Sequence, residues 1–366
     1  MKAAVLYEAR TPLEVEDVEL SGPLQGEVLV QVGAVGVCHS DYHYIAGDLA
    51  TPMPVVLGHE GAGIVEAVGP GVTRVKPGDR VVLLWRPSCG SCEHCARGRP
   101  ALCAISKVQR ASGGMLDGTS RLRKGDTELK HFLGVSCLAE KCVVAEQAAV
   151  KIPDDTPMEI AALLGCSIIT GVGAVLNTAV VRAGSSVLVI GAGGVGLCCV
   201  MGAAVAGAGQ IVVADVSTEK LELARDLGAT DVIHAGREDV VKTAKRMTGG
   251  GADYSFEVIG NPETLLQAIR AIRAGGTAVA VGLAPAEATV PVSINDLVLQ
   301  EKTLKGSLYG SSVPVIDIPM LLRLYLAGQL PLDRFLGRTY SLNEVNEAYG
   351  ALAGGQPGRA VILPNV

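Results

Sequence analysis

Near its middle the chain reads SVLVIGAGGVG, from Ser186 to Gly196. The apolar run at 186–190 predicts a buried strand. The glycines that follow match G-x-G-x-x-G at Gly191, Gly193 and Gly196. The first glycine allows a tight turn, the second lets backbone approach a pyrophosphate, and the third lets the next helix pack closely on the strand. Because the N-terminus of that helix also favours phosphate charge, the stretch predicts a nucleotide-binding strand, turn and helix.

An acidic residue ends the next predicted strand. Gln210 to Ala214 is mostly apolar, and Asp215 follows it, 19 residues after Gly196. A carboxylate there can accept hydrogen bonds from both ribose hydroxyls of an adenosine and repels a 2′-phosphate, which predicts NAD rather than NADP. Lys220 lies near enough along the chain for a ribose contact. S-adenosylmethionine enzymes share a related turn and acidic residue, so the turn alone does not choose the cofactor.

Strands and helices alternate after residue 150. Further strands are expected at 231–234, 254–258, 277–281 and 303–308, with helices between several of them. This alternation predicts an α/β fold with a doubly wound parallel sheet. The first half instead shows short strands and turns, such as the alternating stretch Glu27 to Val32, which favours a barrel or sandwich.

Length and composition limit the class of protein. The chain has 366 residues, which suggests about two domains, and 49% of them are hydrophobic. A net charge of −6 without a basic run argues against nucleic-acid and membrane partners. The stretch Ile160 to Ala214 carries one charge, Arg182, yet its glycines and polar residues favour a buried helix and strand over a membrane span. The first residues lack the apolar core of a secretory signal, so a cytoplasmic location is expected.

Four cysteines recur at short spacing as Cys89-x-x-Cys92-x-x-Cys95-x7-Cys103. Four thiolates at this spacing can close tetrahedrally around one zinc ion and leave no open position, so the predicted role is structural. A redox disulfide is disfavoured because no thioredoxin-like setting surrounds the cysteines. An iron–sulfur cluster is disfavoured because nothing else suggests electron relay. The acidic balance opposes a zinc-ribbon nucleic-acid binder.

A second group of metal-binding residue types lies upstream. Cys38 to His43 reads CHSDYH, and Gly58-His59-Glu60 comes 20 residues after Cys38. With the four-cysteine run, Gly165-Cys166 and the glycine turn, all in this order, these residues resemble the zinc-dependent medium-chain alcohol dehydrogenases. The resemblance covers nearly the whole chain. It implies a GroES-like β-barrel catalytic domain at 1–167 with a structural zinc lobe at about 86–104, a Rossmann dinucleotide-binding domain at 168–308, and a return to the catalytic domain at 309–366.

The resemblance implies roles at a catalytic zinc. Cys38, His59 and Cys166 match its ligands, and the fourth position stays open for water or substrate. Asp41 matches the acid that orients the ligand histidine, and Glu60 matches a carboxylate that can approach the metal during ligand exchange. Four cysteines receive no metal role: Cys137, Cys142, Cys198 and Cys199.

The resemblance also implies a proton relay and cofactor contacts. Ser40 and His43 match a relay from hydroxyl through cofactor ribose and imidazole to solvent. His39 and Arg359 match pyrophosphate-binding positions, and Thr170 matches a nicotinamide-side contact. With the turn, the implied cofactor-binding residues are His39, Thr170, Gly191, Gly193, Gly194, Val195, Gly196, Asp215, Lys220, Val281 and Arg359. The implied cofactors are NAD and two zinc ions per chain, one catalytic and one structural.

The candidate substrate pocket is apolar. Its expected lining residues are Leu49, Trp85, Phe132, Leu283 and Tyr309. They predict primary alcohols and aldehydes of medium length or aromatic character. Alternatives on the same scaffold are a formaldehyde–glutathione adduct, polyols and carrier-assisted alcohol oxidation, and no cationic patch marks the glutathione branch. A non-catalytic zinc and dinucleotide-binding sensor is disfavoured by the relay residues. The long segment Ser106 to Leu129 resembles members that are often dimers, so a homodimer is expected ahead of a homotetramer.

Overall fold

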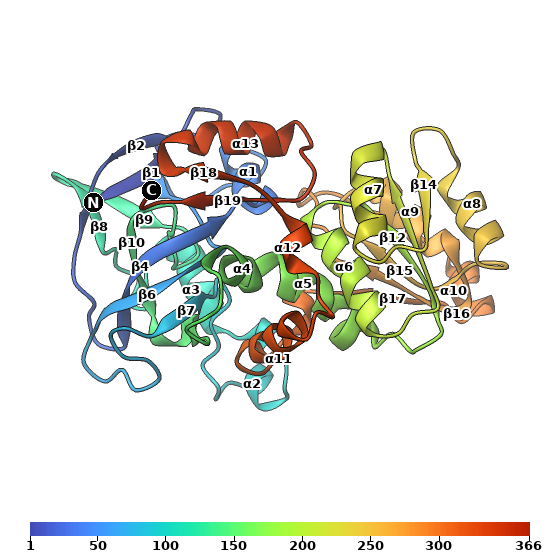
Figure 1. Cartoon of the computed structure of the whole chain (residues 1–366), viewed down its shortest axis with the longest axis horizontal. Helices are drawn as coiled ribbons and strands as arrows, with labels where there is room; N and C mark the ends of the chain where they lie inside the picture. Colours follow the sequence, from blue (N-terminus) through green and yellow to red (C-terminus); the bar gives the residue numbers. More distant parts are fainter. The chain divides into compact units, whose positions relative to one another are not determined.

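The chain divides into two structural units, and each is described by itself. The computed structural model describes residues 1–366, apart from the side chains of Val108 and Arg110. The first unit comprises Met1–Ser167, Val313–Met320 and Leu336–Val366, and the second comprises Ile168–Ser312 and Leu321–Phe335. In Figure 1 the C-terminal strands (red) lie among the N-terminal strands (blue) of the first unit.

The predicted unbroken return of the chain at 309–366 needs a correction. Residues 309–312 and Leu321–Phe335 belong to the second unit. The latter segment contains Leu330, Leu332 and Phe335, which are fully buried. Burying each such side chain is favourable by roughly 1.5–3 kcal/mol, which holds this segment in the second unit before the chain re-enters the first.

Two sheets make up most of the first unit. Their strands are β1 (Lys2–Leu6), β2 (Glu14–Asp17), β3 (Glu19–Leu20), β4 (Glu27–Gly36), β5 (Val55–Val56), β6 (Gly61–Val68), β7 (Arg80–Leu83), β8 (Leu122–Lys124), β9 (Thr127–His131), β10 (Lys141–Ala145), β11 (Ala149–Lys151), β18 (Leu336–Ser341) and β19 (Arg359–Leu363). One sheet has the order β2-β1-β5-β9-β8-β3. The other has the order β11-β7-β6-β4-β19-β18, with β10 also paired to β4. This is the predicted β-rich part of the chain.

Strand β4 follows the alternation seen in its sequence. Val28, Val30 and Val32 are fully buried, whereas Gln31 is exposed. Side chains of a strand point alternately to its two faces, so one face of β4 supplies core and the other reaches solvent. The strand pairs with β6, β10 and β19, which places it at the centre of its sheet.

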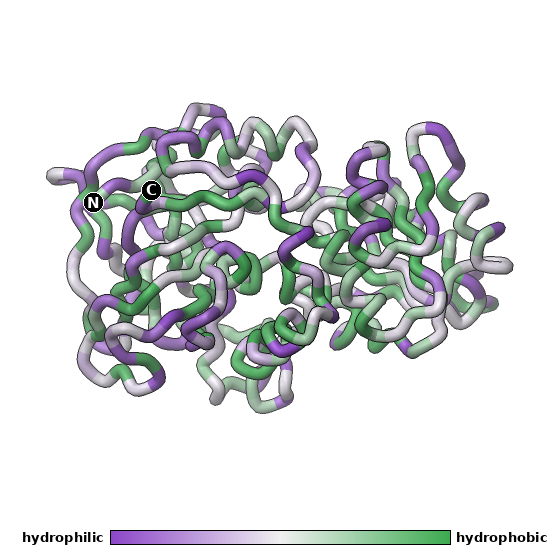
Figure 2. Tube along the Cα trace, in the orientation of Figure 1, coloured by the Kyte–Doolittle hydropathy of each residue, from purple (hydrophilic) through white to green (hydrophobic). Residues whose placement is uncertain are grey.

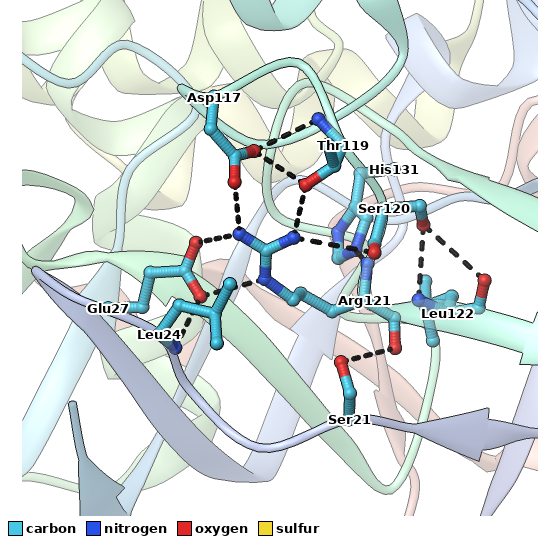
Figure 3. A network of polar contacts seen from close by, with 9 residues as sticks. All are labelled: Ser21, Leu24, Glu27, Asp117, Thr119, Ser120, Arg121, Leu122 and His131. Atoms are coloured by element: carbon cyan, nitrogen blue, oxygen red, sulfur yellow. Dashed lines mark hydrogen bonds and ion pairs between the residues drawn. The ribbon is translucent and has the colours of Figure 1, made fainter.

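A buried arginine ties the segment before β8 to β4 (Figure 3). The Arg121 guanidinium donates to both oxygens of Glu27, at 2.9 and 2.7 Å, and also pairs with Asp117 at 2.7 Å. The Arg121 backbone N–H donates to His131 Nε2 at 3.1 Å. Arg121 and Glu27 are both buried, and a bidentate arginine–carboxylate pair fixes position as well as charge. The long segment after Cys103 is therefore anchored on the central strand.

The second unit is the predicted doubly wound parallel sheet. Its strands are β12 (Ser186–Ile190), β13 (Gln210–Asp215), β14 (Asp231–His234), β15 (Ala252–Glu257), β16 (Ile272–Ala280) and β17 (Thr303–Gly306). They pair in parallel in the order β14-β13-β12-β15-β16-β17, the strand order of a dinucleotide-binding sheet. The accompanying helices are α6 (Gly194–Val205), α7 (Thr218–Asp226), α8 (Val240–Met247), α9 (Pro262–Ala271) and α10 (Ile294–Leu299).

One apolar helical run begins in the first unit and ends in the second. It consists of α4 (Met158–Leu163), the π-helical turn Leu164–Ile168, α5 (Ile169–Gly173) and the π-helical turn Ala174–Ala179. Figure 2 shows the α4 region in the green of hydrophobic residues. Its 22 residues are long and apolar enough to span a membrane, but 83% of its most apolar window is buried inside the protein. Most of this helical run is therefore covered by the protein itself, in agreement with the buried helix predicted from its sequence.

Candidate active site and metal centres

Two cysteines and a histidine converge in the first unit. Cys38 lies directly before α1 (His39–Ile45), His59 lies in the turn before β6, and Cys166 lies in the π-helical turn Leu164–Ile168. Their ligand atoms all lie within 4.8 Å of one another, and all three residues are buried. Cys166 Sγ lies 3.3 Å from His59 Nε2. The structure thus gathers the three expected ligands from separate segments of the chain.

Backbone geometry places two of these ligands. Gly58 has a φ of +91°, and a Cβ there would lie 2.4 Å from the backbone nitrogen of Leu138. Any larger residue would strain the turn and displace the adjacent His59. Cys166 gains its position from a π-helical turn, a widened turn that is common at functional sites.

Asp41 orients the histidine of this cluster. Its carboxylate is fully buried on α1. Oδ1 accepts hydrogen bonds from the Gly58 backbone N–H and from His59 Nδ1, each at 3.1 Å. With Nδ1 used as the donor to Asp41, His59 Nε2 faces Cys166 and can act as a metal ligand.

The donor set fits zinc. The hydrogen bond between the two thiols lowers the pKa of Cys38 well below its usual range and raises that of Cys166. This shift favours the thiolate of Cys38, the form of cysteine that binds metals. Two sulfurs and one imidazole nitrogen suit zinc, and three protein ligands leave a position open.

The four-cysteine lobe has a different, closed geometry. Sulfur–sulfur distances are 4.0 Å for Cys89–Cys95, 3.7 Å for Cys92–Cys103 and 3.5 Å for Cys89–Cys103. Zn–S bonds of about 2.3 Å in a tetrahedron place sulfurs roughly 3.8 Å apart, so the lobe fits one zinc ion. Hydrogen bonds from backbone N–H groups, first that of Ser91, lower the pKa of Cys89 to about 6. The four sulfurs would fill all ligand positions of such an ion and leave no place for a substrate.

Known proteins resemble the chain along almost its whole length. Residues 24–154 match the alcohol dehydrogenase GroES-like domain, and residues 194–326 match the zinc-binding dehydrogenase domain. The NDMA-dependent alcohol dehydrogenase of Amycolatopsis methanolica is 43% identical over 365 residues, covering 99% of this chain and 98% of that protein. The class-3 alcohol dehydrogenase of Drosophila melanogaster is 42% identical over 367 residues, covering 99% and 97%. The crystal structure of benzyl alcohol dehydrogenase from Acinetobacter calcoaceticus matches with a TM-score of 0.93 at 36% identity, covering 99% of this chain and 98% of that chain.

The chain belongs to the zinc-dependent medium-chain alcohol dehydrogenases. It is an oxidoreductase of alcohols that combines a GroES-like domain with a zinc-binding dehydrogenase domain of Rossmann type. The predicted family, fold class and reaction class are confirmed.

Glu60 of this alcohol dehydrogenase is fully engaged beside the ligand cluster. Its Oε1 accepts hydrogen bonds from the Ser167 N–H at 2.9 Å and the Ser167 hydroxyl at 2.6 Å, and its Oε2 pairs with Arg359. Burial raises the pKa of Glu60, and the Arg359 charge opposes that shift. The carboxylate must therefore release one of these partners before it can approach a metal.

Arg359 occupies a different environment from the pyrophosphate site implied by resemblance. It is only 3% exposed, and its guanidinium pairs with Glu60 and hydrogen-bonds Cys38. Two buried negative groups need a cation nearby, which accounts for this position. A phosphate contact requires Arg359 to exchange partners, so that role stays a prediction.

The expected relay residues lie on one short helix. Ser40 and His43 are three residues apart on α1, the spacing that puts side chains on one helix face. His43 Nδ1 lies 3.0 Å from Asp48 Oδ2, and the imidazole is 31% exposed. His43 therefore reaches solvent, as the last group of a proton relay must.

The glycine turn of the second unit fits a dinucleotide. Gly191 has a φ of +104°, which the tight turn requires. A Cβ on Gly193 would meet nothing within 4 Å, whereas one on Gly196 would lie 1.9 Å from the Gly191 oxygen. Backbone at Gly193 therefore faces open space, and the absence of a side chain at Gly196 allows close packing. Gly194 and Val195 begin α6 there.

Asp215 closes the same turn. Its Oδ2 accepts from the Ala192 N–H at 2.7 Å, and its Oδ1 accepts from the Ser217 N–H at 2.9 Å. Each oxygen keeps a lone pair for a ribose hydroxyl. These bonds hold the carboxylate in place at the end of β13.

The remaining expected cofactor residues are dispersed. His39 is exposed at the start of α1. In the second unit Thr170 lies on α5, Lys220 lies on α7 and Val281 follows β16, and all three are half-buried.

Two aromatic rings that were expected to line the substrate pocket lie beside His59. Trp85 and Phe132 lie with ring centroids 6.1 and 5.8 Å from His59, both edge-on. Tyr44, which sequence reasoning missed, packs edge-on against Phe132 at 4.8 Å. Leu49 is half-buried in the same unit. Of the other expected lining residues, Leu283 is 56% exposed and Tyr309 is buried, both in the second unit.

Sequence reasoning also missed Ser167, whose only signal is its place beside Cys166. The cysteines without a metal role are all buried. Burial raises the pKa of Cys142 to about 12 and also raises those of Cys137 and Cys199. Such thiols pack as small apolar residues.

Proposed function

We propose that this enzyme transfers hydride from primary alcohols of medium length or aromatic character to NAD, and back from NADH to the aldehydes. The observation that carries the substrate class is the pair of rings, Trp85 and Phe132, edge-on to His59. Aromatic and aliphatic substrates gain from such apolar surroundings, whereas a polyol would lose hydration there. Asp215 supports NAD, because a fixed carboxylate repels a 2′-phosphate.

Different residues of the chain bind the metal, orient its ligands and transfer the proton. Cys38, His59 and Cys166 would hold the catalytic zinc, and Asp41 keeps His59 in the tautomer that presents Nε2. When bound, zinc supplies Lewis-acid stabilisation of charge on the reacting oxygen, and NAD supplies the hydride acceptor. The Ser40 hydroxyl takes the alcohol proton as it gives up its own, and His43, at the end of the relay, passes a proton to solvent at its exposed edge. The rings beside His59 exclude water from the reacting atoms.

A second candidate is carrier-assisted oxidation, in which an added acceptor regenerates the cofactor. The name of the Amycolatopsis methanolica relative, an NDMA-dependent alcohol dehydrogenase, favours it. The two candidates differ in whether free NAD alone sustains turnover.

Metal analysis joined to a substrate panel tests the proposal. We expect two zinc ions per chain and NADH formation from benzyl alcohol and C4–C8 alcohols with NAD alone. Turnover only after NDMA is added would favour the carrier-assisted candidate. Good activity on polyols with none on benzyl alcohol would overturn the substrate class. Two zinc ions without turnover of any alcohol or aldehyde would favour a sensor.

We also propose a homodimer, paired through the edge of the parallel sheet. Strand β17 forms that edge, and all of its residues are exposed. Helix α10, which precedes it, exposes Ile294, Val298 and Leu299. An open strand edge presents unpaired backbone N–H and C=O groups, here beside exposed apolar side chains. The identical edge of a second copy can pair with it and bury both. Leu299→Asp should shift the mass seen by light scattering from dimer toward monomer; a tetramer that ignores the substitution would contradict this interface.

A cytoplasmic location belongs to the same proposal. All ten cysteines are free, and the six that would bind zinc must be reduced to do so. Cell fractionation with an antibody against the chain tests it.

A further inference from the structure

Two buried polar atoms near the ligand cluster lack hydrogen-bond partners. Asp41 Oδ2 lies 3.1 Å from His59 Nδ1 in an ion pair but accepts no hydrogen bond, and the Tyr349 hydroxyl has no hydrogen-bond partner, among the residues whose side chains are described. Asp41 is fully buried, and Tyr349 is 3% exposed. Native proteins satisfy nearly all such atoms, with protein groups or with bound water. Two such atoms without a hydrogen-bond partner among the described side chains therefore point to a bound water that satisfies them.

The two residues lie on helices that pack against each other. Tyr349 lies on α13 (Val345–Ala353), which packs against α1, the helix that carries Asp41. Figure 1 shows α13 beside α1. Burial raises the pKa of Tyr349 well above its usual range, and the charges of Asp41 and Cys38 raise it further. The phenol is thus close enough to respond to these charges, and it stays a protonated donor at neutral pH.

The two groups are chemically complementary. Asp41 Oδ1 is occupied by Gly58 and His59, and Oδ2 can only accept a hydrogen bond. The Tyr349 hydroxyl can donate one. Arg359 Nε is a third buried atom without a partner, and its charge also acts on Tyr349. A buried water typically makes about 3 hydrogen bonds to groups of this kind, and here it would find one acceptor, one donor and one hydroxyl.

We propose that Tyr349 is a positioning residue for the catalytic metal site: its hydroxyl donates, through one bound water, to Asp41 Oδ2 and thereby fixes the carboxylate that orients His59. The proposal rests on the proposed zinc ligands. Without the hydroxyl, Asp41 keeps its contacts with Gly58 and His59 but loses the hydrogen bond that restrains rotation of its carboxylate. His59 then loses part of its alignment, and the metal leaves more readily.

The test compares zinc release from the two sites of the loaded enzyme. Tyr349→Phe removes only the hydroxyl, and the chelator 4-(2-pyridylazo)resorcinol reports each departing zinc by colour. We expect the catalytic zinc to leave about 3–10 fold faster and the four-cysteine zinc to leave at the wild-type rate. Cobalt in the catalytic site should show a shifted visible spectrum in the variant.

Tyr340→Phe is the matched control. Tyr340 is another 3% exposed tyrosine of the first unit, and its hydroxyl bonds Gln356 at 3.1 Å. It should release both zinc ions at wild-type rates. Unchanged release from the catalytic site of Tyr349→Phe, or equal acceleration at both sites, would overturn the positioning role. A wild-type enzyme that binds zinc only at the four-cysteine lobe would instead overturn the proposed ligands first, so the two failures are distinguishable.

Discussion

The two sulfur clusters of this alcohol dehydrogenase are built in opposite ways. Cys89, Cys92, Cys95 and Cys103 lie in one short stretch, and three of them are partly exposed. The other cluster draws Cys38, His59 and Cys166 from distant segments and buries all three.

The difference shows which ligands are aligned by the fold and which depend on a bound metal for their arrangement. The buried cluster is aligned by groups outside it, namely Asp41, the turn at Gly58 and the π-helical turn. The lobe is held chiefly by backbone N–H groups and by its own sulfurs. Zinc should therefore be needed for chemistry at the first cluster and for stability at the second.

The largest expected effect follows substitution of a buried ligand. Cys38→Ser should lower turnover by at least about 10³-fold, because the loss of Lewis-acid stabilisation raises the activation free energy of hydride transfer by several kcal/mol. Zinc should fall from two ions to one, while NAD binding and the melting temperature stay near wild type. Metal analysis, cofactor titration and a melting curve measure these quantities.

A buried cysteine without a metal role serves as the control for this variant. Cys142→Ala, on β10, should keep both zinc ions and its turnover. If Cys38→Ser lost both zinc ions together, the two clusters would not be independent.

The next effect concerns stability. Cys92→Ser opens the closed four-sulfur shell, so the lobe should lose its zinc and the melting temperature should fall by on the order of 5 °C or more. The catalytic zinc should remain stoichiometric. An unchanged melting temperature with one zinc lost would show that the lobe contributes no stability.

The two clusters also differ in how far the sequence alone predicts them, because the ligands of one lie close together in the chain and those of the other lie far apart. The lobe is a local spacing pattern, and its four members can be named from the sequence alone. Cys38 and Cys166 are far apart, and the sequence pairs them only through resemblance to a family. Likewise the strand, turn and helix at 186–196 are set by local glycine chemistry, and the parallel sheet appears as expected.

Other features depend on contacts that no local pattern encodes. The pairing of Arg359 with Glu60 joins β19 to the turn before β6, and burial decides it. The detour of Leu321–Phe335 into the second unit depends on where its apolar side chains find a core. Tyr349 and Ser167 carry no motif, so their roles appear only when the fold brings them to the ligands.

A smaller effect tests whether residues outside the buried cluster, above all Asp41, align its ligands, whereas the four-cysteine lobe needs no such residue. Asp41→Asn keeps the shape of the side chain but weakens the bond to His59 Nδ1, so the affinity of the catalytic site for zinc should fall about 10–100 fold. The lobe should keep its affinity, since no carboxylate orients its ligands. Competition with a chelator measures both sites.

Asp117→Asn is the matched control for that variant. Asp117 also binds a buried partner in the first unit, Arg121, and its hydrogen bonds among the described side chains go to Arg121 and Thr119 rather than to either cluster. Equal weakening of the catalytic site by both substitutions would contradict a specific role for Asp41.

The smallest effect uses pH to compare the buried surroundings of one cluster with the exposed lobe. His131 precedes Phe132, the ring beside His59, and burial lowers the pKa of His131 to about 3. An unfolded histidine titrates near about 6.5. The stability that comes from a neutral His131 is therefore complete above about pH 6.5 and is lost as the pH falls toward 3, at up to roughly 1.4 kcal/mol per pH unit. Between pH 7 and pH 5 the loss should be about 2 kcal/mol.

Urea unfolding of His131→Gln at both pH values checks this loss. Glutamine can still accept the Arg121 N–H but does not titrate, so the variant should lose about 2 kcal/mol less than wild type over the interval. His94→Gln is the control, because His94 lies exposed within the lobe and its replacement should leave the pH dependence unchanged. If His131→Gln and wild type lost equal stability, water would reach His131 in the folded enzyme. The protein around Phe132 would then be as open to water as the four-cysteine lobe. Burial could not then explain the difference between the two clusters.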